Sequence, residues 1–142
     1  MRKVTICFLL MLCSVWALGQ QPQWIVVQNV VLFNQTTPIP LTTLLTPTEP
    51  GEYRLNAYFS GLGSGSDRNS NSGELDIVGT DLTGAPMSNS LGLSCAQPIF
   101  SSLPTMTMIL KPQVPLVYSV RLGGTGVCKY NLAITIEQLV EQ

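Results

Sequence analysis

The sequence predicts an all-β fold: an antiparallel β-sandwich of jelly-roll type with about eight strands and one disulfide. Short runs alternate between apolar and polar residues, with the period of two expected of strands. Clusters of Gly, Pro, Ser and Asn separate these runs, and no run after the N-terminal segment favours a helix. Many short strands divided by turn signals are typical of sandwiches and jelly rolls.

The N-terminal segment has the features of an export signal. Arg2 and Lys3 form a basic start, residues 4–15 are almost entirely apolar, and Ala17-Leu18-Gly19 places small residues at a cleavage site. The apolar run is short for a membrane span. We therefore expect residues 1–19 to be a cleaved signal peptide.

The mature chain is then expected to be a single β-sandwich domain over residues 20–142, without a membrane span. A lipid anchor at Cys13 is not expected, because the residue before it is the bulky Leu12. The expected location is secreted or periplasmic.

Loss of the signal peptide leaves two cysteines, Cys95 and Cys128, and five basic against eight acidic residues, a formal net charge of −3. Two cysteines in an exported chain predict a disulfide. No basic patch is present to follow phosphates, so nucleic acid is not an expected partner. Only 11% of the residues are charged, which leaves strand edges poorly protected against pairing with other chains.

Residues 51–60 form the strand around which the prediction is organised. Pro50 and Gly51 give a turn signal, after which two faces alternate. The face expected on the core has Tyr53, Leu55, Ala57 and Phe59. The face expected in water has Glu52, Arg54, Asn56 and Tyr58.

The other strands are expected at residues 24–33, 41–46, 74–80, 87–94, 105–110, 116–122 and 129–139. Residues 24–33 are apolar on both alternating faces and rich in β-branched side chains, which predicts a strand buried on both sides. Residues 61–73 are mostly Gly, Ser and Asn, which predicts a long loop. The segment after Cys95, with Pro98 and Pro104, is expected to be irregular.

The absence of histidine from the sequence excludes a Ser-His-Asp or Cys-His catalytic arrangement. Glu74 and Asp76 lie two apart on a strand and share a face, as the paired carboxylates of a glycoside hydrolase would. Two acids on a solvent-facing strand are equally an ordinary surface feature. No catalytic residue is expected.

Oxygen-bearing side chains at alternate positions could supply a calcium site. The candidate ligands are Asp67, Asn69, Asn71 and Asp76. The segment does not match an EF-hand, because Ser72 and Val78 occupy the positions of its glycine and glutamate. The alternative is a Ser/Asn-rich loop without a metal; no other cofactor is expected.

Exposed aromatic rings can stack on the apolar faces of sugars. Trp24 and Tyr58 are the candidates, Tyr58 because it falls on the polar face of its strand. The alternative is that both are amphipathic surface side chains without a ligand.

Several strand and turn motifs support a resemblance that covers most of the mature chain. They are Leu45-Thr46-Pro47, Gly51-Glu52-Tyr53-Arg54-Leu55, Pro115-Leu116-Val117-Tyr118-Ser119-Val120, Tyr130-Asn131-Leu132 and Ile136-Glu137-Gln138-Leu139. With them the chain resembles a group of small exported bacterial proteins. The entry into the strand at Gly51 and Tyr53 is also similar to jelly-roll heads of the tumour-necrosis-factor and complement type, which form trimers, and to carbohydrate-binding sandwiches. The resemblance implies a fold and no functional residue.

These observations favour a non-catalytic binding or assembly module of the cell envelope or extracellular space, which self-associates through apolar surfaces such as residues 24–33. Its partners would be copies of itself or an envelope protein. A module that binds polysaccharide through Tyr58 or Trp24 is the second hypothesis. A hydrolase built on Glu74 and Asp76 is the third.

Overall fold

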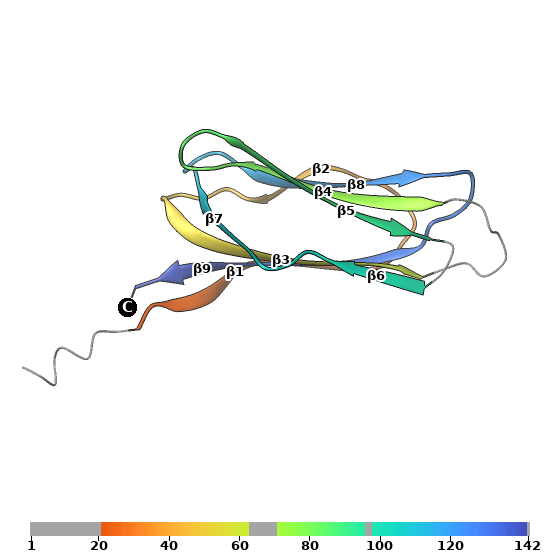
Figure 1. Cartoon of the computed structure of the whole chain (residues 1–142), viewed down its shortest axis with the longest axis horizontal. Coiled ribbons are helices and arrows are strands. Elements are labelled where there is room, and N and C mark those ends of the chain that lie inside the picture. Colours follow the sequence, from red (N-terminus) through yellow and green to blue (C-terminus); the bar gives the residue numbers. More distant parts are fainter. Residues whose placement is uncertain (1–20, 63–70, 96–97, 142) are drawn as a thin grey trace, which may run out of the picture.

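The computed structural model describes residues 21–62, 71–95 and 98–141. These residues form nine strands in two antiparallel sheets that stack face to face (Figure 1). The predicted signal peptide, residues 1–19, lies outside them. No helix capable of crossing a membrane occurs in this part of the chain.

Each sheet combines strands from distant parts of the sequence. The first sheet has the order β1-β9-β3-β6, and β7 also pairs with β3. Its strands are β1 (Gln23–Gln35), β9 (Tyr130–Val140), β3 (Gly51–Leu62), β6 (Pro98–Ser102) and β7 (Met106–Leu110). The second sheet has the order β2-β8-β4-β5. Its strands are β2 (Ile39–Leu45), β8 (Leu116–Gly123), β4 (Ser72–Thr80) and β5 (Pro86–Ser94).

The pairing pattern is that of a jelly roll. β1 pairs with β9, β2 with β8, β3 with β6 and β7, and β4 with β5, all antiparallel. The chain is thus folded back on itself as one long ribbon, and the ribbon is rolled so that alternate pairs fall in opposite sheets. This arrangement confirms the predicted fold class.

β6 and β7 are two halves of one strand position along β3. β6 pairs with Tyr58–Leu62 of β3, and β7 pairs with Gly51–Leu55. Pro104 lies between the halves and has no backbone N–H for the ladder. The segment after Cys95 is therefore not irregular throughout, because β6 forms within it, and the strand count is nine in the described residues rather than eight.

β3 has the alternation that its sequence predicts. Tyr53, Leu55, Ala57 and Phe59 are buried between the sheets, while Tyr58 is exposed. β8 and β9 alternate in the same way, and Tyr118, Val120, Ile134 and Ile136 all belong to the buried core. The core face predicted for β3 is confirmed.

The strand predicted at residues 24–33 is confirmed as β1, but its predicted burial on both sides is wrong. β1 is an edge strand of the first sheet, paired only with β9 among the described strands, and its apolar side chains are exposed on one side. Val30 and Leu32 pack on the core, whereas Val31 and Phe33 face outwards. An apolar run is therefore not sufficient to make a central strand.

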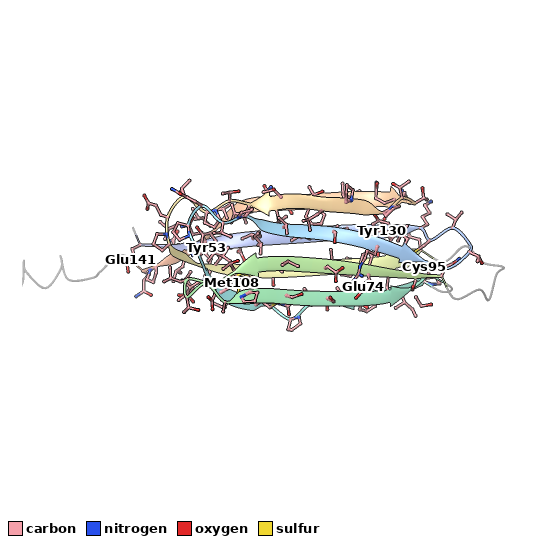
Figure 2. The ribbon with its side chains drawn as sticks, turned by 90° about the horizontal axis from the view of Figure 1, so that it is seen from above. Tyr53, Glu74, Cys95, Met108, Tyr130 and Glu141 are labelled. Atoms are coloured by element: carbon pink, nitrogen blue, oxygen red, sulfur yellow. A yellow bond between two sulfur atoms is a disulfide. The ribbon has the colours of Figure 1, made fainter. Side chains whose placement is uncertain are left out.

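The predicted disulfide joins Cys95, just after β5, to Cys128, just before β9, with 5.3 Å between the Cα atoms. It connects the two sheets at one end of the sandwich, where Tyr130 also lies (Figure 2). Tyr130 is completely buried, meets the ring of Phe59 edge-on, and donates its hydroxyl to the carbonyl of Thr37 at 2.8 Å. Burial raises the pKa of Tyr130 to about 12.

Candidate functional site

The outer surfaces of the two sheets differ in character. The outer surface of the second sheet has serines and the ion pairs of Arg121. The outer surface of the first sheet has six of the twelve large exposed apolar side chains of the described residues: Val26, Val31, Phe33, Tyr58, Phe100 and Ile109. We therefore place the candidate functional surface on the first sheet.

The register of the first sheet brings an aromatic pair together. Ser60 of β3 lies opposite Phe100 of β6, and Tyr58 lies opposite Ser102, so the two aromatic residues are diagonal neighbours. Their ring centroids are 6.1 Å apart, and the ring planes differ by only 21°. The side chain of Phe100 is 70% exposed and that of Tyr58 is 43% exposed. This pair forms the aromatic part of the site.

A hollow of about 250 Å³ lies beside the aromatic pair, and its lining includes Tyr58, Ser60, Leu62, Ile99, Phe100 and Asn131. Asn131 is on β9, next to β3. Its Oδ1 accepts the backbone N–H of Asn34 at 2.9 Å, and its Nδ2 donates to Ser60 Oγ at 3.4 Å. These two bonds hold the amide of Asn131 in one orientation at the hollow.

The sequence predicts Tyr58 as an exposed aromatic residue, but it does not predict that Phe100 and Asn131 lie beside it in the hollow. Phe100 comes from β6, which the sequence did not reveal as a strand. The signal that could have found it is the run Pro98-Ile99-Phe100, which follows closely after Cys95. Asn131 is not among the candidate functional residues that the sequence predicts.

Trp24 is not part of this hollow. The guanidinium carbon of Arg54 lies 4.6 Å from the centroid of the Trp24 ring. Arg54 is itself held by Glu137, through bonds from Nε to Oε2 and from Nη2 to Oε1, the second 2.8 Å long. Trp24 thus covers a structural ion pair, and the structure separates the two predicted sugar-stacking residues.

Polar side chains lie between these two ends of the surface. Thr105 donates to Asn56 Oδ1 at 2.6 Å, and Thr135 donates to Asn29 Oδ1 at 3.3 Å. These pairs divide the aromatic hollow from the cation–π contact of Trp24.

The carboxylates of Glu74 and Asp76 both face Arg121. Its Nη2 lies 3.1 Å from Glu74 Oε2 and 2.9 Å from Asp76 Oδ2. Asp76 also accepts the hydroxyl of Ser90 at 2.6 Å through its other oxygen. The pair predicted as candidate acids thus belongs to an ion-pair network on β4, where Figure 2 labels Glu74.

The calcium candidates are only partly within the described residues. Asp67 and Asn69 lie outside them. Asn71 is buried just before β4, and its Oδ1 accepts the backbone N–H of Gly126 at 2.8 Å, while Asp76 faces Ser90 and Arg121. Among the described residues, no group of three acidic or cysteine side chains has the geometry of a metal site.

A second hollow, of about 410 Å³, opens between the β4–β5 turn and β7. Its lining includes Leu82, Met87, Met106, Met108 and Ile109. Met87 and Met106 pack on the core, and Met108 belongs to it. Flexible thioether side chains commonly fill such irregular gaps at the margin of a core.

Comparison with models of known protein families gives no match, and neither does comparison with the sequences of curated proteins. Among solved structures, the chain is similar to one from Bacillus endospore appendages, described as a novel family of disulfide-linked pili. The two are 12% identical, the match covers 84% of this chain and 92% of that chain, and the TM-score is 0.39.

Two further solved structures come from infectious bursal disease virus. One is of the Gt strain (10% identity, 87% of this chain, 43% of that chain, TM-score 0.22) and the other of the VP2 subviral particle (9% identity, 87% and 43%, TM-score 0.20). This chain spans less than half the length of those viral chains. No functional property is transferred from likenesses at these scores. What the described residues themselves define is a disulfide-linked jelly-roll sandwich.

Proposed function

We propose that the chain is an exported, non-catalytic module of the cell envelope or extracellular space that assembles with copies of itself through β1. The observation that supports this most strongly is the length and composition of that edge strand. β1 has 13 residues, and none of them is charged, a proline or a glycine. An uncharged edge of this length is a template for another strand, because no described strand pairs with its outer side.

The side chains of β1 strengthen the same argument. Val26 is 59% exposed and Phe33 is 66% exposed on the outer surface of the first sheet, so this face of β1 would bury apolar surface when a second chain is added. β2, an edge of the second sheet, is different: it contains Pro40, which blocks one position of the ladder.

A bulge at Val27 limits the continuous part of the edge. Pairing with β9 shifts register between Val26 and Gln28, and then runs without interruption from Gln28 to Leu32. Bulges bend a strand and locally reduce its capacity to pair. The segment Gln28–Leu32 is therefore the centre of the proposed contact, where β1 of a second copy would extend the first sheet.

Export is supported by the disulfide, because such bonds persist in oxidising compartments outside the cytosol. The basic and apolar character of residues 1–19 supports the same destination. In an exported protein, an edge strand of one copy meets the edge strands of others in the extracellular space or periplasm.

Sedimentation or light scattering of the mature chain tests the proposal. The wild type is expected to have a mass above that of the monomer at micromolar concentration, under reducing and non-reducing conditions alike, because the disulfide is within one chain. Val31→Lys places a charge on the exposed side of the contact strand. It is expected to weaken association at least tenfold, about 1.4 kcal/mol.

Ile109→Lys is the matched control, since Ile109 is 50% exposed on β7, at the opposite side of the same sheet. It is expected to leave the mass unchanged. A wild-type monomer at micromolar concentration would overturn the proposal, and so would equal effects of both substitutions.

A further inference from the structure

The lining of the hollow beside Tyr58 and Phe100 includes no residue of the proposed assembly strand, whose Asn34 only donates its backbone N–H to Asn131. β6 forms one edge of the first sheet and β1 forms the other, with β9 and β3 between them. Neighbouring strands are spaced by about 4.8 Å, so the two edges are roughly 14 Å apart. A ligand in the hollow and a second chain on β1 would not compete for the same residues.

The aromatic rings of the hollow are displayed to solvent. The two rings are stacked on each other, with ring planes that differ by only 21°, so they form one aromatic unit. Phe100 is the more exposed of the two, so a flat apolar ligand would bury more surface on its ring than on that of Tyr58. Such a partner must be rigid and planar enough to lie on a ring face.

The polar groups of the hollow specify a hydroxyl-bearing ligand. An amide side chain has two N–H donors and two acceptor lone pairs on its oxygen, and Asn131 uses one donor and one lone pair on Ser60 and Asn34. It therefore keeps one donor and one acceptor, in a fixed orientation. A hydroxyl group both donates and accepts, which matches this pair of functions.

The described lining of the hollow has no charged side chain. A charged ligand would lose its hydration without gaining an ion pair, which is costly. The hollow is also open and only about 250 Å³ in volume. It therefore suits a single ring of a polymer whose other units remain in solvent better than it suits a long acyl chain.

We propose that this hollow binds one pyranose ring of a neutral polysaccharide. Phe100 stacks on the apolar C–H face of the sugar and is supported by the ring of Tyr58, while Asn131 exchanges hydrogen bonds with the sugar's hydroxyl groups. The module would thus bind a glycan surface at β6 while β1 serves assembly.

Binding to soluble cellohexaose, chitohexaose and mannohexaose, followed by calorimetry and by NMR shifts of the mature chain, tests this proposal. Saturable binding of at least one of the three is expected. Phe100→Leu keeps the apolar character but removes the ring, and it is expected to lower the affinity tenfold or more. Asn131→Ala is expected to have a similar effect.

Ile109→Ala is the control, an exposed apolar residue on the same sheet and outside the lining of the hollow. Its affinity should equal that of the wild type. No binding of any of the three oligosaccharides would overturn the proposal, and full affinity in Phe100→Leu would overturn the stacking role. Val31→Lys, which tests assembly, should leave sugar binding intact, so that the two proposals can fail separately.

Discussion

Arg54 and Glu137 form a two-point ion pair across β3 and β9, and Trp24 of β1 lies over the guanidinium. Three neighbouring strands are thereby joined on the outer face of the first sheet. The pair is only partly exposed, with 33% of the Arg54 side chain and 16% of the Glu137 side chain accessible. The hydrogen bonds from Arg54 lower the pKa of Glu137 below its ordinary value of 4.5.

This lowered pKa predicts that the stability of the folded protein decreases in acid. The unfolded chain binds a proton at Glu137 at higher pH than the folded chain does, so the stabilisation is fully present above about pH 4.5 and is lost as the pH falls through the lowered pKa. Glu137→Gln is expected to reduce stability at neutral pH and to flatten its decline in acid. Urea denaturation at a series of pH values measures both. Glu52→Gln, at an exposed position on β3, is the control, and an unchanged acid slope in Glu137→Gln would contradict the prediction.

The disulfide is expected to contribute substantially to stability. Cys95 and Cys128 are 33 residues apart and both are 2% exposed. The loss of loop entropy in the unfolded chain corresponds to about 3–4 kcal/mol for a loop of this length. Cys95→Ala with Cys128→Ala should lower the free energy of unfolding by that amount in urea. A change below about 1 kcal/mol would show that the bond is not a stabilising constraint.

Asn71 and Gly126 are coupled at the disulfide end of the sandwich. Asn71 Oδ1 accepts the Gly126 N–H, and a Cβ at position 126 would overlap Asn71 Nδ2. Asn71→Ala is expected to cost about 1–3 kcal/mol because it leaves a partly buried donor without its partner. Gly126→Ala should destabilise the wild type more than it destabilises Asn71→Ala. The free energy of unfolding is measured by thermal denaturation for the wild type, the two single variants and the double variant, which form a double-mutant cycle. Additive losses in the double variant would exclude the coupling.

Phe59 and Phe100 have the same side chain on neighbouring strands but opposite surroundings. Phe59 is completely buried, whereas Phe100 is 70% exposed. Phe59→Ala should reduce the free energy of unfolding by about 3–5 kcal/mol, because it leaves a cavity in the core. Phe100→Ala should stay within about 0.5 kcal/mol of the wild type. Chemical denaturation distinguishes a core residue from an exposed one. A large loss of stability in Phe100→Ala would contradict our assignment of Phe100 to the surface.

The sequence was sufficient to predict the strands that have one apolar face on the core and one polar face in water. Along β3 and β9, alternate residues differ sharply in polarity, so the buried face can be assigned from the pattern alone. β1 lacks this contrast, because its outward face also has valines and a phenylalanine. Its edge position depends on strand order, which local patterns do not encode.

The candidate hollow could be predicted only in part for a related reason. Tyr58 stood out because an aromatic residue interrupted a polar face. Phe100 and Asn131 reach it from strands that are remote in the sequence, through the pairing of β3 with β6 and β9. The covering of Trp24 by Arg54 likewise depends on how the strands are arranged in space.

The place of β9 between β1 and β3 also determines when this fold can form. β9 is the last of the nine described strands in chain order, yet it completes the ladders of β1 and of β3. Contacts between residues so distant in sequence make folding slow, in the range of milliseconds to seconds. The first sheet cannot close until residues 130–140 have been synthesised. The first sheet is therefore completed in a late step, once the final strand is available to join β1 to β3.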